Sequence, residues 1–219
     1  NICHVILTTA DTLALVMLPG IQYYSGQFLD LKSITHAAHK VGAYAGFDLA
    51  HVVGNIPVKL HEDQIDFAAW CSYKYLNSGP GNVSGVFIHE KHGKNPEFPR
   101  LAGWWGQNET TRFSMKNFFD PLPGVDGWML SNANIISSVA HLASLDMFEK
   151  VGIQELRKKS ILLTGYLEYL LINNVSIKPH IKILTPKNKS ERGCQLSIYF
   201  YSQGKKAFEH LTKNGVTID

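Results

Sequence analysis

The sequence predicts an α/β protein: a large domain with a mostly parallel sheet flanked by helices, followed by part of a smaller α+β domain. Two observations carry this prediction. In the first half, short continuous apolar segments flank a helical segment, which is typical of parallel strands covered on both faces. From Val175 onward the strands become shorter, and one of them alternates apolar and polar residues as a half-buried antiparallel strand does.

The spacing of apolar residues predicts a βαβ unit near the start of the chain. The apolar run 13–18 predicts a buried strand that ends at Pro19 and Gly20. Residues 30–40 place apolar side chains at helical spacing, and a glycine at position 42 is suited to the left-handed residue that follows a helix. A second short apolar strand follows at 43–48. A right-handed crossover between two parallel strands is therefore expected.

The later elements follow in the same way. Strands are expected at 65–71 and 83–89, and a long irregular region at 91–127, whose length favours a functional role. Helices are expected from about residue 133 to about 150, over 153–172 and over 205–214, with strands at 181–184 and 194–201. The domain organisation expected from this order is 1–134 for the large domain, 135–174 for connecting helices and 175–219 for the start of the small domain.

Composition excludes several classes of function. The 219 residues are 45% hydrophobic and 18% charged, as in ordinary globular proteins, and the net charge is only +3. The basic residues are scattered, so neither nucleic acid nor a membrane is expected as a partner. Three widely spaced cysteines form no disulfide framework, which favours a reducing, cytoplasmic location. The chain begins without methionine and stops as residues 216–218 start to resemble a strand, so we expect a fragment of a longer protein.

Polar side chains follow two neighbouring strands of the predicted sheet. Asp48 ends one strand, and Lys74 lies just beyond the next, before a glycine-rich turn at 79–85. Ligands of open α/β sheets bind at the carboxyl ends of the strands. A lysine there can hold an aldehyde cofactor as a Schiff base, and a buried carboxylate can pair with the pyridinium nitrogen of pyridoxal phosphate. His51 could stack on the ring or bond to one of its substituents.

Each of these residues also has a structural interpretation. Lys74 could be a solvated lysine at a strand end, Asp48 a helix N-cap and His51 a satisfied core histidine. The local pattern leaves both interpretations open.

The wider sequence resembles kynureninase, a fold-type I pyridoxal-phosphate enzyme of the class V aminotransferase-like superfamily. The resemblance is carried by Gly46-Phe-Asp-Leu-Ala-His-Val-Val-Gly54 and Trp70-Cys-Ser-Tyr-Lys-Tyr-Leu-Asn77. It continues in collinear order through segments 86–92, 103–106, 111–113, 123–125, 131–132, 156–170 and 192–196. The related cysteine desulfurases share the lysine, but they typically have glutamine at the position of His51 and histidine at that of Tyr73.

The resemblance implies a role for six residues. Lys74 would be the catalytic Schiff-base lysine, and the cofactor-binding residues would be Asp48, His51, Tyr73, Lys74, Trp104 and Asn132, with no metal. The cofactor would be pyridoxal 5'-phosphate. Trp104 and Asn132 would complete the cofactor and substrate site, and in a homodimer they could come from the partner subunit.

The implied reaction is hydrolysis of the Cβ–Cγ bond of L-kynurenine or 3-hydroxykynurenine, giving an anthranilate and L-alanine in tryptophan catabolism and NAD biosynthesis. Pro19 stands where related enzymes have a cofactor-contacting serine, and Gln107 where animal enzymes often have histidine. The phosphate-binding loop, the ring-stacking aromatic and the arginine for the substrate carboxylate would lie outside this stretch. Two alternatives stay open: an inactive fragment that serves only as a dimerisation piece, and another fold-type I enzyme such as a cysteine desulfurase or lyase.

Overall fold

The computed structural model describes residues 1–95 and 98–219. Two residues of the expected irregular region, 96–97, lie outside the described part. By its internal contacts the chain divides into two compact units, which are described separately here. The first comprises Asn1–Gly20 and Leu29–Ile153, and the second comprises Ile21–Phe28 and Gln154–Asp219.

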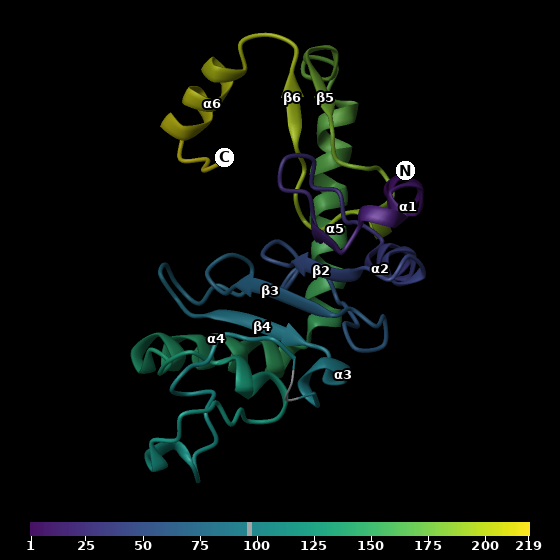
Figure 1. The fold of residues 1–219 in the computed structure, drawn as a ribbon. Coiled ribbons are helices and arrows are strands. Elements are labelled where there is room, and N and C mark those ends of the chain that lie inside the picture. The colour runs from purple at the N-terminus through teal and green to yellow at the C-terminus, as the bar shows by residue number, and fades with distance from the viewer. Residues whose placement is uncertain (96–97) are drawn as a thin grey trace. The chain divides into compact units, whose positions relative to one another are not determined.

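A four-stranded sheet forms the centre of the first unit (Figure 1). Its strands, in spatial order, are β1 (Leu15–Pro19), β2 (Tyr44–Asp48), β3 (Phe67–Cys71) and β4 (Ser84–Ile88). The first three are parallel, and β4 runs antiparallel to β3. All four strands were predicted from apolar runs, and their positions are confirmed. The carboxyl ends of β1, β2 and β3 therefore meet at one edge of the sheet.

The helices of the first unit include one that the sequence predicted well. Helix α2 (Leu31–Lys40) begins at Asp30, whose Oδ1 accepts a hydrogen bond from the Ser33 backbone N–H at 3.0 Å. It packs beside β2 and buries the apolar positions that gave the helical spacing. Gly42 follows with φ of 78°, as the predicted left-handed residue requires. The other helices are α1 (Ile2–Thr8), which was not predicted, α3 (Glu90–Gly93), α4 (Ile135–Val151) and 3-10 turns at Ala10–Thr12, Arg112–Ser114 and Gly124–Trp128.

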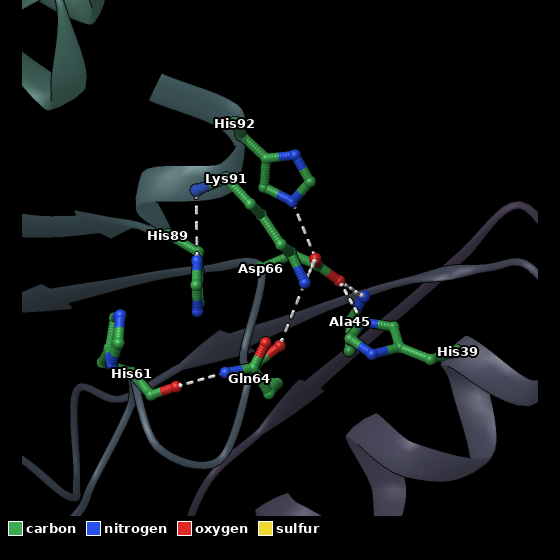
Figure 2. A network of polar contacts seen from close by, with 8 residues as sticks. All are labelled: His39, Ala45, His61, Gln64, Asp66, His89, Lys91 and His92. Carbon is green, nitrogen blue, oxygen red and sulfur yellow. Dashed lines mark hydrogen bonds and ion pairs between the residues drawn. The ribbon is translucent and has the colours of Figure 1, made fainter. Parts of the chain in front are cut away.

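A buried carboxylate ties the sheet of this unit to two of its helices (Figure 2). The side chain of Asp66, just before β3, is only 2% exposed. Its Oδ2 accepts hydrogen bonds from the Ala45 N–H of β2 at 2.7 Å and from His39 Nε2 of α2 at 2.8 Å. Its Oδ1 lies 2.6 Å from Lys91 Nζ and 2.7 Å from His92 Nε2, both on α3. One side chain at the start of β3 thus bonds to α2, β2 and α3.

The charge state of Asp66 follows from these contacts. Burial on its own would raise the pKa of this carboxyl. The hydrogen bonds from Lys91, Ala45, His39 and His92 outweigh burial and hold the pKa far below its ordinary value. Asp66 is therefore ionised across the whole range in which proteins usually work.

The second unit contains α5 (Ile153–Asn173, whose first residue belongs to the first unit), β5 (Ile181–Ile183), β6 (Ile198–Phe200) and α6 (Gly204–Lys213). Strands β5 and β6 pair antiparallel, as expected for an α+β unit. Two 3-10 turns, Lys178–His180 and Lys189–Glu191, complete it. The domain boundaries predicted after residues 134 and 174 stay a prediction. The division by contacts places α4 in the first unit and most of α5 in the second.

Two elements of this unit differ from the predictions. The strand expected over 194–201 is confined to Ile198–Phe200. The Ser197 backbone N–H donates to the Thr185 hydroxyl at 2.8 Å, and the Gln195 side-chain Nε2 donates to Tyr23 O at 2.6 Å. One ladder bond persists here, from the Leu184 N–H to Ser197 O at 2.8 Å, but the Ser197 N–H bonds to a side chain rather than to a neighbouring strand. Residues 216–218, which resembled the start of a strand, are irregular.

We expect Arg192→Met to destabilise the protein by about 3 kcal/mol, because a buried ion pair would lose one partner. The Arg192 side chain is 2% exposed, and its guanidinium lies 2.5 Å from Glu168 and donates to Pro186 O at 3.1 Å. Lys158→Met, which removes an exposed pair with Glu155, is the control and should change the free energy of unfolding by less than about 0.5 kcal/mol. Urea unfolding measures both, and equal effects would contradict the prediction.

Candidate active site

Lys74 and His51, two of the predicted residues, are in direct contact at the carboxyl edge of the sheet. Asp48 is the last residue of β2, and Lys74 lies three residues beyond the end of β3, which is parallel to β2. The Lys74 Nζ atom lies 2.8 Å from Nε2 of His51. The lysine amine and the imidazole therefore form a hydrogen-bonded pair next to the strand that carries the carboxylate.

The chain around Lys74 is folded into a tight turn. The Ser78 N–H donates to Ser72 O at 3.1 Å and closes the segment, and the Asn77 N–H donates to Lys74 O at 3.1 Å. Asn77 has φ of 56°, a left-handed conformation that asparagine adopts more readily than most residues. On the other side, Gly54 lies so close that an added Cβ would be 2.9 Å from the Tyr75 carbonyl. Glycine is therefore needed at position 54, because a side chain there would clash with the turn.

Asp48 differs in burial from the expectation. The sequence suggested a buried carboxylate, but Asp48 is exposed in this chain. Its Oδ1 accepts a hydrogen bond from the Ala50 backbone N–H at 2.8 Å, so the side chain stabilises the turn after β2 rather than a helix N-terminus. Within the described residues Oδ2 has no hydrogen bond. An acceptor oxygen is thus available at the sheet edge.

Tyr73, next to the lysine, is half exposed. A hydrogen bond with the Cys71 thiol raises the pKa of its phenol, and the negative charge of Asp48 adds to this effect. The phenol therefore stays protonated and can donate a hydrogen bond. The sequence analysis did not single out Cys71, because a cysteine at the end of an apolar strand looks like an ordinary core residue.

Trp104 lies in an ordered loop elsewhere in the first unit. The Cζ atom of Arg112 is 5.6 Å from the centroid of the Trp104 ring and 4.8 Å from that of Trp105. Arg112 also donates to Trp105 O and Gln107 O at 3.3 Å and 3.1 Å. Trp104 remains 47% exposed despite these contacts.

Two further predicted positions are accounted for separately. The Gln107 amide donates to Thr111 Oγ1 and accepts from the Asp120 N–H, both at 3.0 Å, so this side chain is engaged within its loop. Asn132 is exposed, three residues before α4 begins. In the described part of the chain, neither Trp104 nor Asn132 is bonded to Lys74 or Asp48. The roles of all six site residues stay a prediction.

The donor set at the sheet edge fits pyridoxal phosphate. A primary amine can attach the aldehyde, a carboxylate with an available oxygen can pair with a ring nitrogen, and a neighbouring phenol can donate to a phosphate. Across the described residues, no group of three histidine, cysteine or acidic side chains is arranged to hold a metal ion. No helix in the described ranges is both long and apolar enough to cross a membrane.

Known structures define the class of fold. A cysteine desulfurase from Thermococcus onnurineus superposes over 98% of this chain and 51% of its own, with a TM-score of 0.74 and 15% identity. A variant of the cystine lyase C-DES, with glycine linked to its pyridoxal-phosphate cofactor, superposes over 98% of this chain and 56% of its own, with a TM-score of 0.76 and 20% identity. The fold is therefore that of the fold-type I pyridoxal-phosphate enzymes.

Sequence comparison narrows the class to one family. The kynureninase of Flavobacterium psychrophilum is 51% identical over all of this chain and 52% of its own length, and that of Nematostella vectensis is 47% identical over 95% and 47%. Residues 156–219 match the family model of the kynureninase C-terminal domain. The chain belongs to the kynureninase family. It spans about half the length of the curated relatives it matches.

Proposed function

We propose that the protein to which this chain belongs hydrolyses the Cβ–Cγ bond of L-kynurenine or 3-hydroxykynurenine, releasing anthranilate or 3-hydroxyanthranilate and L-alanine. The proposal rests on one observation above all: the Lys74 amine lies 2.8 Å from His51, beside the strand that ends at Asp48, in a chain about half identical to kynureninases. The proposed reaction would belong to tryptophan catabolism and NAD biosynthesis.

Pyridoxal phosphate, when bound, supplies an electron sink next to the amino-acid α-carbon. Lys74 would hold the cofactor through its amine and would then move the proton at the α-carbon of the substrate. His51 would orient the Lys74 amine through the hydrogen bond between Nε2 and Nζ. An amine held in one direction transfers protons more effectively than a freely rotating one.

The residues on either side would bind the rest of the cofactor. Asp48 would pair with the pyridine nitrogen and keep it protonated, since a nearby negative charge favours the cationic form. Tyr73, whose raised pKa keeps its hydroxyl protonated, would donate a hydrogen bond to the phosphate. Trp104, which is 47% exposed, would contact an aromatic ring, and Asn132 would contact the substrate.

The remaining parts of the proposal concern assembly and location. We propose a homodimer in which Trp104 or Asn132 reaches the site of the neighbouring subunit, because neither contacts Lys74 within the described chain. A cytoplasmic location is proposed from the three widely spaced cysteines, Cys3, Cys71 and Cys194.

The test uses protein expressed from its complete reading frame, supplied with pyridoxal phosphate and L-kynurenine. Release of fluorescent anthranilate is expected. Borohydride reduction followed by peptide mass spectrometry should place the cofactor on Lys74. A reduced cofactor on another lysine would overturn the site. Cofactor on Lys74 without anthranilate release would overturn the reaction, and sulfide release from cysteine in the presence of added dithiothreitol as reductant would then favour a desulfurase.

A further inference from the structure

Two residues of helix α4 form hydrogen bonds to the turn that carries Lys74, although they lie more than 60 residues later in the sequence. The hydroxyl of Ser144, which is 3% exposed, donates to Leu76 O. One turn earlier on the same helix, His141 Nδ1 lies 2.7 Å from Ser78 Oγ, and Ser78 is 6% exposed. Positions three apart share one face of a helix, so both bonds come from the same side of α4.

These two bonds hold the turn on either side of Asn77, in addition to the bonds that Asn77 and Ser78 make within the turn. Among the described residues, Leu76 O accepts a hydrogen bond from no group other than Ser144. Between Leu76 and Ser78 lies Asn77 in its left-handed conformation. Asparagine adopts this conformation more readily than most residues, and contacts on both sides favour it further. The contacts from α4 supply that support on both sides of Asn77.

We propose that His141 and Ser144 are positioning residues for Lys74. By fixing Leu76 and Ser78, they fix the turn whose first residues carry the amine, and so they keep Lys74 Nζ within hydrogen-bonding distance of His51. The assignment of Lys74 as the lysine that binds the cofactor rests on the proposed function. The proposal that α4 stabilises the turn rests only on the two hydrogen bonds.

Hydrogen exchange tests the link without any cofactor. The amides of Asn77 and Ser78 are bonded within the turn, and they should exchange about five- to tenfold faster in His141→Ala or Ser144→Ala, as the loss of one hydrogen bond predicts. His141→Asn keeps a polar atom near the position of Nδ1 and should restore the slower rate. The matched control, Ser138→Ala, removes a hydroxyl that bonds only within α4 and should change exchange less than twofold.

A second readout concerns the lysine itself. At saturating pyridoxal phosphate, cofactor attachment to Lys74, followed by borohydride reduction and mass spectrometry, should be about fivefold slower in His141→Ala and normal in His141→Asn and Ser138→Ala. If the wild-type protein attaches no cofactor at Lys74, the proposed function fails, and the exchange rates alone decide the positioning role. Unchanged exchange at Asn77 and Ser78 in both alanine variants would overturn the inference, as would a His141→Asn variant no better than His141→Ala.

Discussion

Replacing Lys74 with alanine is expected to lower the rate of anthranilate release at least about a thousandfold, because one side chain supplies both the covalent attachment and the proton transfer. The visible absorbance of the lysine-bound cofactor should disappear as well. Lys74 is exposed, so the free energy of unfolding should change by less than about 0.5 kcal/mol. Absorbance spectra, a fluorescence assay for anthranilate and urea unfolding measure the three quantities.

Two further variants separate chemistry from charge. Lys74→Arg keeps a positive charge near His51 but cannot attach an aldehyde, so it should be as inactive as Lys74→Ala. Lys59→Ala removes another exposed lysine of the same unit and should leave activity unchanged. An arginine variant with substantial activity would show that charge alone suffices and that Lys74 has no covalent role.

Replacing Asp66 with alanine is expected to lower the free energy of unfolding by about 3 kcal/mol or more, the largest stability effect we expect in the first unit. The change removes the common acceptor of Lys91, His39 and His92 (Figure 2). It also leaves the backbone N–H of Ala45, a residue that is 0% exposed, without its acceptor. Urea unfolding near neutral pH measures the loss.

The control for Asp66 is a carboxylate in a surface pair. Asp63 lies 4.0 Å from Lys32, whose side chain is 75% exposed. Asp63→Ala should therefore cost less than about 0.5 kcal/mol. If both aspartate variants unfolded at the same urea concentration as the wild type, the network in Figure 2 would contribute nothing to stability.

The stability that Asp66 provides should depend on pH in a defined direction. Its pKa is lowered in the folded protein, so its contribution is complete above the unfolded pKa of about 3.9 and is lost as the pH falls further towards the folded pKa. The difference in unfolding free energy between wild type and Asp66→Asn should accordingly shrink as the pH falls below about 4. A difference that grew on acidification would contradict this sign.

The parts of the fold that the sequence predicted are those in which neighbouring residues decide the outcome. The strand that ends at Asp48 and helix α2 follow from local apolar spacing, from the cap at Asp30 and from the glycine at position 42. That the strand ending at Asp48 and the strand preceding Lys74 end at a common edge followed from the same pattern, because parallel strands end at one edge of a sheet.

The parts that the sequence did not predict depend on distant contacts. From the sequence, Asp66 resembles an ordinary polar residue at the start of a strand. The neighbouring residues do not indicate that side chains of both α2 and α3 bond to it. His141 and Ser144 read as ordinary helix positions, since their partners lie more than 60 residues away. Strand β6 is shorter than its alternating pattern predicted, and just before it the Ser197 N–H bonds to the Thr185 side chain instead of a neighbouring strand.

The reach of α4 back to the Lys74 turn has a consequence for the order of events during synthesis. The strand before Lys74 and the strand after it are made early and can pair locally. The turn between them is incomplete until Ser144 has left the ribosome, about 70 residues later. Contacts of such long sequence separation form late in folding. A nascent chain should therefore form the sheet before the Lys74 side chain is oriented. A cofactor present during synthesis would then bind to an ordered Lys74 turn only after α4 has packed against it.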